Sequence, residues 1–251
     1  MKFSRPWPSH PLQVKERLSD PEQKRALNRQ LFDLVAPRYD AVTRVLSMDR
    51  DRVWKQRLVD ALPQVAAPIC LDLACGTGDL CFLLAAKYPD GLITGLDLTP
   101  AMLARARARA TAATRVRFLH GDMGRIGLAS GSVDIVTGGY ALRNAGEIGE
   151  TLAEIHRVLK PGGIGCFLDF SKSHRWATQN LGKLVLRAWG AWWGWVFHRD
   201  PDVYGYIAES LERFPDRKRL ARLFRDHGLE VQASTLYYFG LVQRVTVRKP
   251  M

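Results

Sequence analysis

The chain has 251 residues, of which 47% are hydrophobic and 25% are charged, so its composition is that of a globular protein and excludes a disordered or fibrous chain. Lysine and arginine number 37 and aspartate and glutamate 25, which gives a formal net charge of +12. This surplus favours an anionic neighbour, either nucleic acid or an acidic lipid surface, and charge alone does not choose between them.

The first residues and the cysteines of the chain indicate its cellular compartment. The opening segment, MKFSRPWPSHPLQVKERL, has prolines and charges where a signal peptide needs an unbroken apolar region. The longest apolar run, AWGAWWGWVF, is shorter than the roughly 18 residues that a membrane-spanning helix needs. We therefore expect a cytoplasmic protein, with peripheral contact to the inner face of the membrane as an open alternative. No C-x-x-C pair suggests a metal site, and we expect small buried thiols at Cys70, Cys75, Cys81 and Cys166.

Residues 1–67 are predicted to form a helical segment that belongs to the same domain as the rest of the chain. A helix is expected to begin after Asp20, which is a good N-cap and precedes a proline. A second helix is expected over about residues 49–62. The first helix has leucines on one face: Leu27, Leu31 and Leu34.

From residue 68 onward, short apolar or β-branched runs alternate with helical patterns. The expected strands are PICLDLA, GLITGLDL, VRFLH, VDIVTGG and GGIGCFLDF. This alternation is typical of βαβ units and of a parallel sheet covered on both faces. Residues 68–251 are therefore predicted to form a doubly wound, Rossmann-like α/β core.

The alternation is interrupted after the fifth expected strand. Residues of about 171–215 form an insertion rich in tryptophan and tyrosine, which we expect to be a helical cap. The pattern then resumes with a helix over 216–227 that ends at Gly228. The runs VQAST and LVQRVTV are predicted to close the sheet as an antiparallel pair.

A glycine-rich turn follows the first expected strand. In LDLACGTGDL, Gly76-Thr77-Gly78 lies between a strand and a helix, and Asp97 ends the next strand 19 residues later, where a carboxylate accepts bonds from ribose hydroxyls. The third glycine of a dinucleotide fingerprint would fall at Cys81, which disfavours NAD, and no G-K-[ST] sequence indicates a phosphate loop. S-adenosylmethionine, a nucleoside cofactor without phosphates, fits this pattern.

A second cofactor segment, Gly121-Asp122-Met123, lies just beyond the third expected strand. It would place a carboxylate and a backbone N–H at the edge of an adenine ring. The side chain of Asp122 is equally suited to an Asx turn, so the residue alone leaves both interpretations open.

Six segments, in their order and spacing, are similar to those of class I S-adenosylmethionine methyltransferases: LDLACGTGDL, GLDLTPAML, GDM, ALRNAGEI, RVLKPGG and LDFSKS. More narrowly, the chain resembles the ubiquinone and menaquinone biosynthesis C-methyltransferase family over most of residues 32–230. The narrower resemblance is carried by LRN, DFSK and Y-x-Y-I-A-E-S. It implies methyl transfer to an aromatic or lipid-tailed hydroquinone in quinone biosynthesis, and a specialised natural-product pathway is the alternative.

The resemblance also implies a set of site residues. Those expected around the cofactor are Gly76, Thr77, Gly78, Asp97, Leu98, Asp122, Met123 and Gly139. Those expected to face the substrate are Tyr39, Tyr140 and Glu209, with Arg143 and Asn144 serving methyl transfer. Because a guanidinium stays protonated, Arg143 is expected to stabilise a forming phenolate or to polarise a water, and Asn144 offers both a donor and an acceptor. From the residues alone, the alternative is an Arg-Asn pair that caps the following helix.

The tryptophan-rich insertion has two interpretations. Aromatic residues with basic neighbours, Lys183 and Arg187, suit a membrane interface that would leave a polyprenyl tail in lipid. The alternative is a cap helix packed on the sheet or on a second subunit of a homodimer. Residues expected on one apolar face are Leu181, Val185, Trp189, Trp192, Trp193 and Val196.

Two functions of other classes compete with a quinol methyltransferase. The charge of +12 motivates an RNA methyltransferase, but the fourth strand ends in GGYALRN rather than in the Asn/Asp-Pro-Pro-aromatic signature of base amino-methylation. We therefore expect no nucleic-acid partner. A catalytically silent protein that binds the cofactor or a lipid within a biosynthetic assembly is the other alternative.

Overall fold

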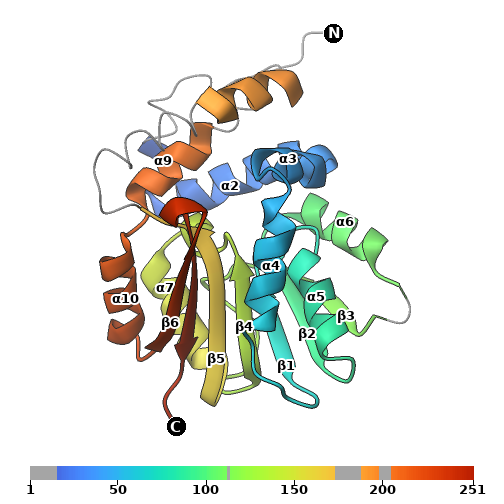
Figure 1. The fold of residues 1–251 in the computed structure, drawn as a ribbon, viewed down its shortest axis with the longest axis vertical. Coiled ribbons are helices and arrows are strands. Elements are labelled where there is room, and N and C mark those ends of the chain that lie inside the picture. Colours follow the sequence, from blue (N-terminus) through green and yellow to red (C-terminus); the bar gives the residue numbers. More distant parts are fainter. Residues whose placement is uncertain (1–15, 112–113, 173–187, 198–204) are drawn as a thin grey trace.

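The computed structural model describes residues 16–111, 114–172, 188–197 and 205–251. Its centre is a seven-stranded sheet with the strand order β3-β2-β1-β4-β5-β7-β6 (Figure 1). The strands are β1 Ile69–Leu73, β2 Leu92–Asp97, β3 Val116–His120, β4 Val133–Gly139, β5 Leu159–Phe170, β6 Glu230–Tyr237 and β7 Val242–Arg248. This order confirms the predicted doubly wound α/β class I methyltransferase fold.

The direction of the strands determines where a site can form. Strands β1 to β5 pair in parallel, and β7 runs antiparallel between β5 and β6, which confirms the predicted closing pair. The chain order reverses between β1 and β4, the neighbouring strands from which the sheet grows in opposite directions. In open α/β sheets, ligands bind beyond the carboxyl ends of the strands at such a switch point.

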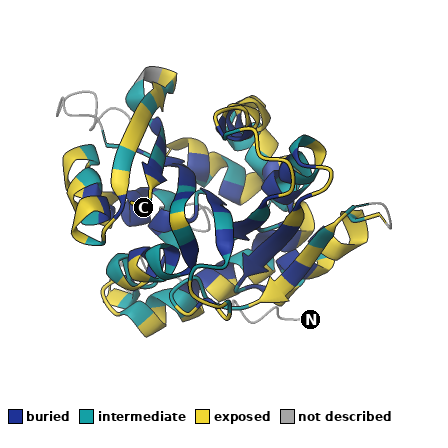
Figure 2. Ribbon diagram, turned by 90° about the horizontal axis from the view of Figure 1, so that it is seen from below, coloured by how far each residue is buried: buried dark blue, intermediate teal, exposed yellow. Residues whose placement is uncertain are grey.

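Helices cover both faces of the sheet, so the central strands β1, β2, β4 and β5 are mostly buried, whereas the edge strands β3 and β6 are largely exposed (Figure 2). Successive residues of β1 alternate between the faces, since Cys70 packs with one helical layer and Leu71 with the other. One layer contains α4 (Arg50–Asp60), α5 (Asp79–Lys87) and α6 (Pro100–Arg109). The other contains α7 (Ile148–Val158) and α10 (Arg217–Asp226).

A third group of helices lies beyond the carboxyl ends of the parallel strands (Figure 1). It consists of α2 (Pro21–Val35), the short turn η1 (Ala36–Arg38), α3 (Tyr39–Leu46), the helix at 188–197 and α9 (Gly205–Arg213). We call these helices the cap. Met102 of α6 is buried in the same apolar cluster as α2 and α3, which supports the proposal that residues 1–67 and 68–251 form one domain.

The predicted leucine face of the first helix is confirmed. Leu27 and Leu31 are buried and Leu34 packs beside them. The helix expected over residues 49–62 is α4, whereas α3 was not predicted because its eight residues mix apolar and charged side chains without an N-cap signal. The four cysteines are free and buried, as expected. Among the described helices, none is both long and apolar enough to cross a bilayer.

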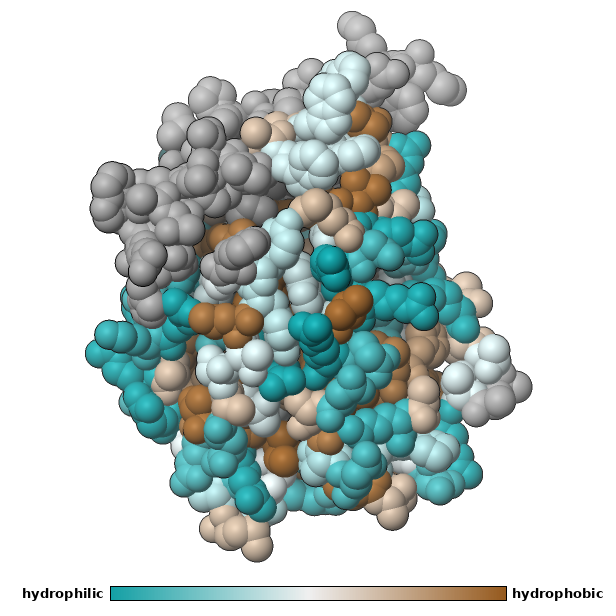
Figure 3. All heavy atoms as spheres, in the orientation of Figure 1, coloured by the Kyte–Doolittle hydropathy of each residue, from teal (hydrophilic) through white to brown (hydrophobic). Residues whose placement is uncertain are grey.

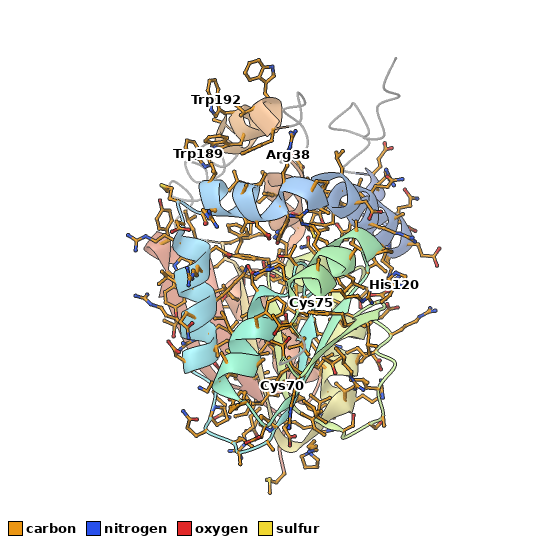
Figure 4. The ribbon with its side chains drawn as sticks, turned by 90° about the vertical axis from the view of Figure 1, so that its right-hand side faces the viewer. Arg38, Cys70, Cys75, His120, Trp189 and Trp192 are labelled. Carbon is orange, nitrogen blue, oxygen red and sulfur yellow. The ribbon has the colours of Figure 1, made fainter. Side chains whose placement is uncertain are left out.

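The predicted tryptophan face is wrong in one respect. Trp192 and Trp193 do not share a buried face, because α2 and α3 pack against the side of this helix that carries Trp193. Trp193 stacks on Phe197 with ring centroids 5.4 Å apart and packs against the α2–α3 cluster, whereas Trp192 and Trp195 are 59% and 51% exposed. Figure 4 shows Trp192 on the cap helix farthest from the sheet. Other residues of that prediction lie outside the described part of the chain: Leu181, Lys183, Val185 and Arg187.

Candidate functional site

The glycine-rich loop joins β1 to α5 at the switch point. Gly76 and Gly78 have φ angles of +54° and +89°. These angles favour glycine, because at positive φ a Cβ atom would crowd the backbone of its own residue. Above Gly76 the nearest atom to an added Cβ is a ring carbon of Tyr39 at 3.9 Å, so this backbone is open to a ligand. An added Cβ on Gly78 would lie 3.0 Å from Phe82, so Gly78 serves the packing of α5 instead.

The Asp97 carboxylate connects this loop to the end of β2. Its Oδ2 accepts the N–H of Gly76 and its Oδ1 accepts the N–H of Thr99, both at 2.8 Å. Burial raises the pKa of Asp97, and the two backbone N–H groups oppose that rise. Because each carboxylate oxygen can accept a second hydrogen bond, Asp97 can still bind the two hydroxyls of a ribose.

A cleft of about 670 Å³ opens above the loop. Its walls combine the polar end of β2 with apolar side chains of Phe32, Leu96 and Met102. These surfaces fit a nucleoside, with hydroxyl acceptors at one end and apolar contacts for a base. Predicted cofactor residues that line the cleft are Gly76, Asp97, Leu98, Asp122, Met123 and Gly139.

The side chain of Asp122 forms the Asx turn and also borders the cleft. Its Oδ1 accepts the N–H of Gly124 at 2.9 Å, as in an Asx turn, and the residue also lines the cleft. Its Oδ2 forms an ion pair of 2.6 Å with Nε of Arg25, a residue of α2 that the sequence analysis missed. The predicted contact between Asp122 and an adenine edge stays a prediction.

A smaller pocket of about 300 Å³ adjoins the cleft and contains Thr77 and Asp72. Asp72 lies in the middle of β1 and accepts a hydrogen bond of 2.7 Å from the Thr137 hydroxyl. Burial raises the pKa of Asp72 to about 7. The sequence analysis did not select Asp72, although a carboxylate inside the apolar run LDL is a signal, because burying a carboxylate in an apolar strand is costly.

A second cavity, of about 1,210 Å³, lies between the cap and the carboxyl end of β5. It shares four residues with the nucleoside cleft: Phe32, Tyr39, Tyr140 and Asn144. Its walls are otherwise mainly apolar, with contributions from Leu31, Val42, Trp54, Phe170, Trp189 and Val242. Among the described residues that line it, Arg143 is the single charged side chain.

The guanidinium of Arg143 is held in place from several sides. Its Nε lies 3.5 Å from the Asp169 carboxylate, and its backbone N–H donates to the same carboxylate at 2.9 Å. The guanidinium carbon lies 5.4 Å from the ring centroid of Phe170 and 6.0 Å from that of Tyr206. Because the N-cap of α7 is Glu147, the interpretation of Arg143 as a cap of the following helix is wrong.

Asn144 belongs to a buried hydrogen-bond network. Its Nδ2 donates to the backbone oxygen of Tyr140 at 2.8 Å, and its Oδ1 accepts from the Tyr206 hydroxyl at 3.0 Å. Asn28 Oδ1 lies within hydrogen-bond distance of the same hydroxyl, whose single proton is therefore shared between the two amide oxygens, and Asn28 Nδ2 donates to the backbone oxygen of Asn144. Burial raises the pKa of Tyr206 to about 12, so this network holds neutral groups around Asn144.

Of two residues in the Y-x-Y-I-A-E-S motif on α9, Tyr206 and Glu209, one lines a cavity and the other does not. Tyr206, which the sequence analysis did not select, lines the second cavity, whereas the predicted substrate residue Glu209 is buried and lines neither of the two cavities. Residues three apart on a helix lie on similar but not identical faces, and the motif alone did not show which face meets the cavity. A substrate contact of Glu209 stays a prediction.

Residues 20–247 match the model of the ubiE/COQ5 methyltransferase family. A ubiquinone/menaquinone biosynthesis C-methyltransferase UbiE from Dinoroseobacter shibae is 35% identical over 83% of this chain and 85% of its own length. A demethylmenaquinone methyltransferase from Thermus thermophilus is 34% identical over 83% of this chain and 95% of its own. A 2-phytyl-1,4-naphtoquinone methyltransferase from Thermosynechococcus vestitus is 35% identical over 80% of this chain and 89% of its own length.

Solved structures show the same fold at lower identity. A SAM-dependent methyltransferase from Thermotoga maritima superposes with a TM-score of 0.63 at 17% identity, covering 88% of this chain and 99% of its own. A SAM-dependent methyltransferase from Aquifex aeolicus superposes with a TM-score of 0.57 at 16% identity, covering 78% of this chain and 89% of its own.

Asp97→Ala is expected to weaken binding of S-adenosylhomocysteine, the demethylated cofactor, by about 1 to 3 kcal/mol, because a charged hydrogen-bond acceptor is removed. Isothermal titration calorimetry measures the change, and Asp90→Ala is the matched control because Asp90 is an exposed carboxylate that does not line the cleft. An unchanged affinity in Asp97→Ala would place the ribose contact elsewhere.

Proposed function

The chain belongs to the ubiE/COQ5 methyltransferase family, and from this membership we propose that it methylates a ring carbon of a lipid-tailed hydroquinone. It is an S-adenosylmethionine-dependent methyltransferase. The observation that carries the choice of acceptor is the apolar second cavity, which meets the nucleoside cleft at Tyr39, Tyr140 and Asn144.

The walls of the second cavity support an acceptor with a long apolar part and few polar atoms. Burying a prenyl tail against Leu31, Val42 and Trp54 removes apolar surface from water, which is the main source of affinity for such a molecule. A polar or phosphorylated acceptor would leave its polar groups without partners there. The apolar walls also disfavour RNA as the acceptor, because RNA phosphates bind in a basic groove.

Arg143 is the residue best placed to act on the ring. When bound, S-adenosylmethionine supplies an electrophilic methyl group on a positively charged sulfur. The ring carbon attacks readily once the neighbouring hydroxyl gives up its proton, and the oxygen then carries negative charge. A guanidinium fixed by Asp169, Phe170 and Tyr206 stabilises that charge without reorganising, and it stays protonated throughout.

The residues shared by both cavities position the ring. Tyr39 and Phe32 come from the cap, while Tyr140 and Asn144 come from the segment after β4, so the ring would be held between two parts of the fold. The amide of Asn144 is oriented by Tyr140 and Tyr206 and offers a fixed contact to a ring oxygen. Positioning of this kind lowers the barrier by holding acceptor and methyl group in line and by excluding water.

The helix at 188–197 supports a contact with a membrane surface. Trp189 lines the second cavity, and the neighbouring Trp192 and Trp195 are exposed on the outside of the cap. Figure 3 shows brown and pale side chains together at the upper end of the visible face, whereas in its middle and lower parts brown side chains are scattered among hydrophilic ones. Exposed tryptophans favour the membrane interface, and a net charge of +12 favours an anionic one. A tail could then pass between lipid and cavity beside Trp189.

The acceptor is tested directly with purified protein and labelled S-adenosylmethionine. We expect methyl transfer to the ring carbon of a prenylated naphthohydroquinone or benzohydroquinone, and kcat/KM that rises with the length of the tail as more apolar surface is buried. Transfer RNA and an untailed catechol serve as comparison substrates. Transfer to RNA, or equal activity with and without a tail, would contradict the proposal.

Arg143→Ala is expected to lower kcat by roughly two to three orders of magnitude, the scale of losing one preorganised donor to a developing anion. Arg143→Lys should recover part of this loss, since it keeps a positive charge beside Asp169 but not the planar fork. Affinity for S-adenosylhomocysteine should stay near that of the wild type. Unchanged kcat together with a lower melting temperature would make Arg143 a structural residue only.

Trp192→Ala combined with Trp195→Ala is expected to reduce co-sedimentation with vesicles of phosphatidylglycerol and phosphatidylcholine. Wild-type sedimentation should fall with added salt, because basic residues near an anionic surface contribute on the order of 1 kcal/mol each. Trp193→Ala is the control, since that side chain packs inside the cap and its loss should lower stability without removing an exposed ring. Sedimentation that is unaltered in the double variant would argue against a membrane contact of this helix.

A further inference from the structure

The cap helix α2 forms part of the wall of both cavities. Its residues Arg25, Asn28 and Phe32 line the nucleoside cleft. Its residues Leu31, Phe32 and Val35 line the second cavity. One helix therefore borders both the cofactor site and the proposed acceptor site, so its position affects the two together.

The Arg25 side chain is held by two carboxylates from different elements. Its Nε lies 2.6 Å from Oδ2 of Asp122, in the loop after β3, and its Nη2 lies 2.6 Å from Oε2 of Glu150 on α7. The side chain is 20% exposed, so most of its surface is removed from water and the two carboxylates compensate for the loss of hydration. Arg25 thus joins the cap to the loop after β3 and to α7.

Two glycines leave room for this guanidinium. A Cβ atom added to Gly146, in the loop before α7, would lie 2.7 Å from Nε and 2.9 Å from Cζ of Arg25. A Cβ atom added to Gly124 would lie 3.3 Å from Nη2. Gly146 does not have a positive φ angle that would itself favour glycine, so its small size serves the close approach of Arg25. The loops thus form a slot for Arg25 at the edge of the nucleoside cleft, which Arg25 and Gly146 both line.

Asp122 connects this slot to the cofactor side. The residue lines the nucleoside cleft together with Gly121 and Met123, and its Oδ1 accepts the N–H of Gly124 at 2.9 Å. A nucleoside that contacts this segment fixes the loop, and with it the carboxylate that faces Arg25. If the loop moves away, the guanidinium loses one of its two partners in a mostly buried position, which is costly.

Asn28 connects α2 to the acceptor side. It lies three residues after Arg25, on a neighbouring turn of the helix. Its Nδ2 donates to the backbone oxygen of Asn144 at 2.6 Å, and its Oδ1 lies within hydrogen-bond distance of the Tyr206 hydroxyl. Asn144 lines both cavities and Tyr206 lines the second one. Because Asn28 is 4% exposed, a displacement of α2 would leave buried polar groups without partners.

We propose that Arg25 is a positioning residue that couples the two sites. With the cofactor in place, Asp122 holds Arg25, α2 is fixed over the cleft, and Asn28 completes the network around Asn144. The acceptor then meets a complete cavity wall, so each ligand binds more tightly when the other is present. This coupling is reciprocal, because one free energy is shared by the two sites. It rests on the proposed function, since it requires an acceptor in the second cavity.

The test measures the Kd of S-adenosylhomocysteine by isothermal titration calorimetry, without and with a saturating prenylated naphthoquinone. This quinone is the oxidised form of the proposed acceptor and has no hydroxyl proton to lose. In the wild type, we expect the quinone to lower the Kd by at least about fivefold, the lower end of typical coupling between sites. In Arg25→Ala, the ratio of the two Kd values should fall to about one.

The reciprocal measurement uses the fluorescence of the protein, to which Trp54 and Trp189 of the second cavity contribute. Quenching by the quinone gives the Kd of the quinone without and with S-adenosylhomocysteine. The ratio should equal that from calorimetry in the wild type and be about one in Arg25→Ala.

Three further variants separate coupling from a purely structural role. Arg25→Lys keeps a positive charge but cannot hold Asp122 and Glu150 in the same way, so it should retain part of the ratio. Gly146→Ala keeps the guanidinium but fills its slot, so it should lose the ratio, and it tests the proposal independently if Arg25→Ala does not fold. Arg29→Ala is the matched control, because Arg29 is exposed on the same helix, and it should keep the wild-type ratio.

A wild-type ratio in Arg25→Ala together with a lower melting temperature would make Arg25 a structural residue only and overturn the coupling. A ratio of one in a wild type that binds both ligands would overturn it as well. A wild type that binds no prenylated naphthoquinone would instead overturn the proposed function.

Discussion

The hydrogen bonds of the Asp97 carboxylate hold together the two strand ends on which the whole site depends. One oxygen accepts the N–H of Gly76 in the glycine loop after β1 and the other accepts the N–H of Thr99 in the turn into α6, so a single carboxylate joins two neighbouring βα loops. The open backbone at Gly76 can then face the cleft because the loop has a defined position. The nucleoside cleft follows from this local geometry, which lies at the switch point of the sheet.

The second cavity, where we propose that the acceptor binds, is built in a different way, from elements far apart in the chain. Phe32 and Tyr39 of the cap, Tyr140 and Arg143 after β4, and Tyr206 of α9 meet around one apolar cavity. The charge of Arg143 is tolerated there because Asp169 and two aromatic rings compensate for its burial. The polar groups of the cavity are thus few and fixed, which suits an acceptor that is mostly hydrocarbon.

Features encoded within one βα unit could be predicted from the sequence. The spacing from Gly78 to Asp97 predicted a ligand cleft at the ends of β1 and β2, where the structure has one, and the alternation of strands and helices predicted the fold, because both depend on residues close in the chain. Asn28 could not be found in this way, since its partner, Asn144, lies 116 positions away. A periodic pattern carries no information about such pairs.

The helix at 188–197 shows a second limit of sequence patterns. An apolar run predicts a helix and a face, but not which face the rest of the fold covers. Trp193 and Trp192 are neighbours of the same type, yet only the first packs into the cap, because the position of α2 and α3 decides which side is inside. For the same reason, the sequence pattern did not show that Tyr206 of α9 lines the second cavity while Glu209 does not.

The central claim is that the acceptor ring lies at the junction of the two cavities, with its tail in the apolar one. A crystal structure with S-adenosylhomocysteine and a prenylated naphthohydroquinone tests this most directly. We expect a ring oxygen within hydrogen-bond distance of Arg143 or Tyr140 and a tail against Leu31, Val42 and Trp54. A ring bound outside this junction, or a tail that leaves the apolar cavity empty, would contradict it.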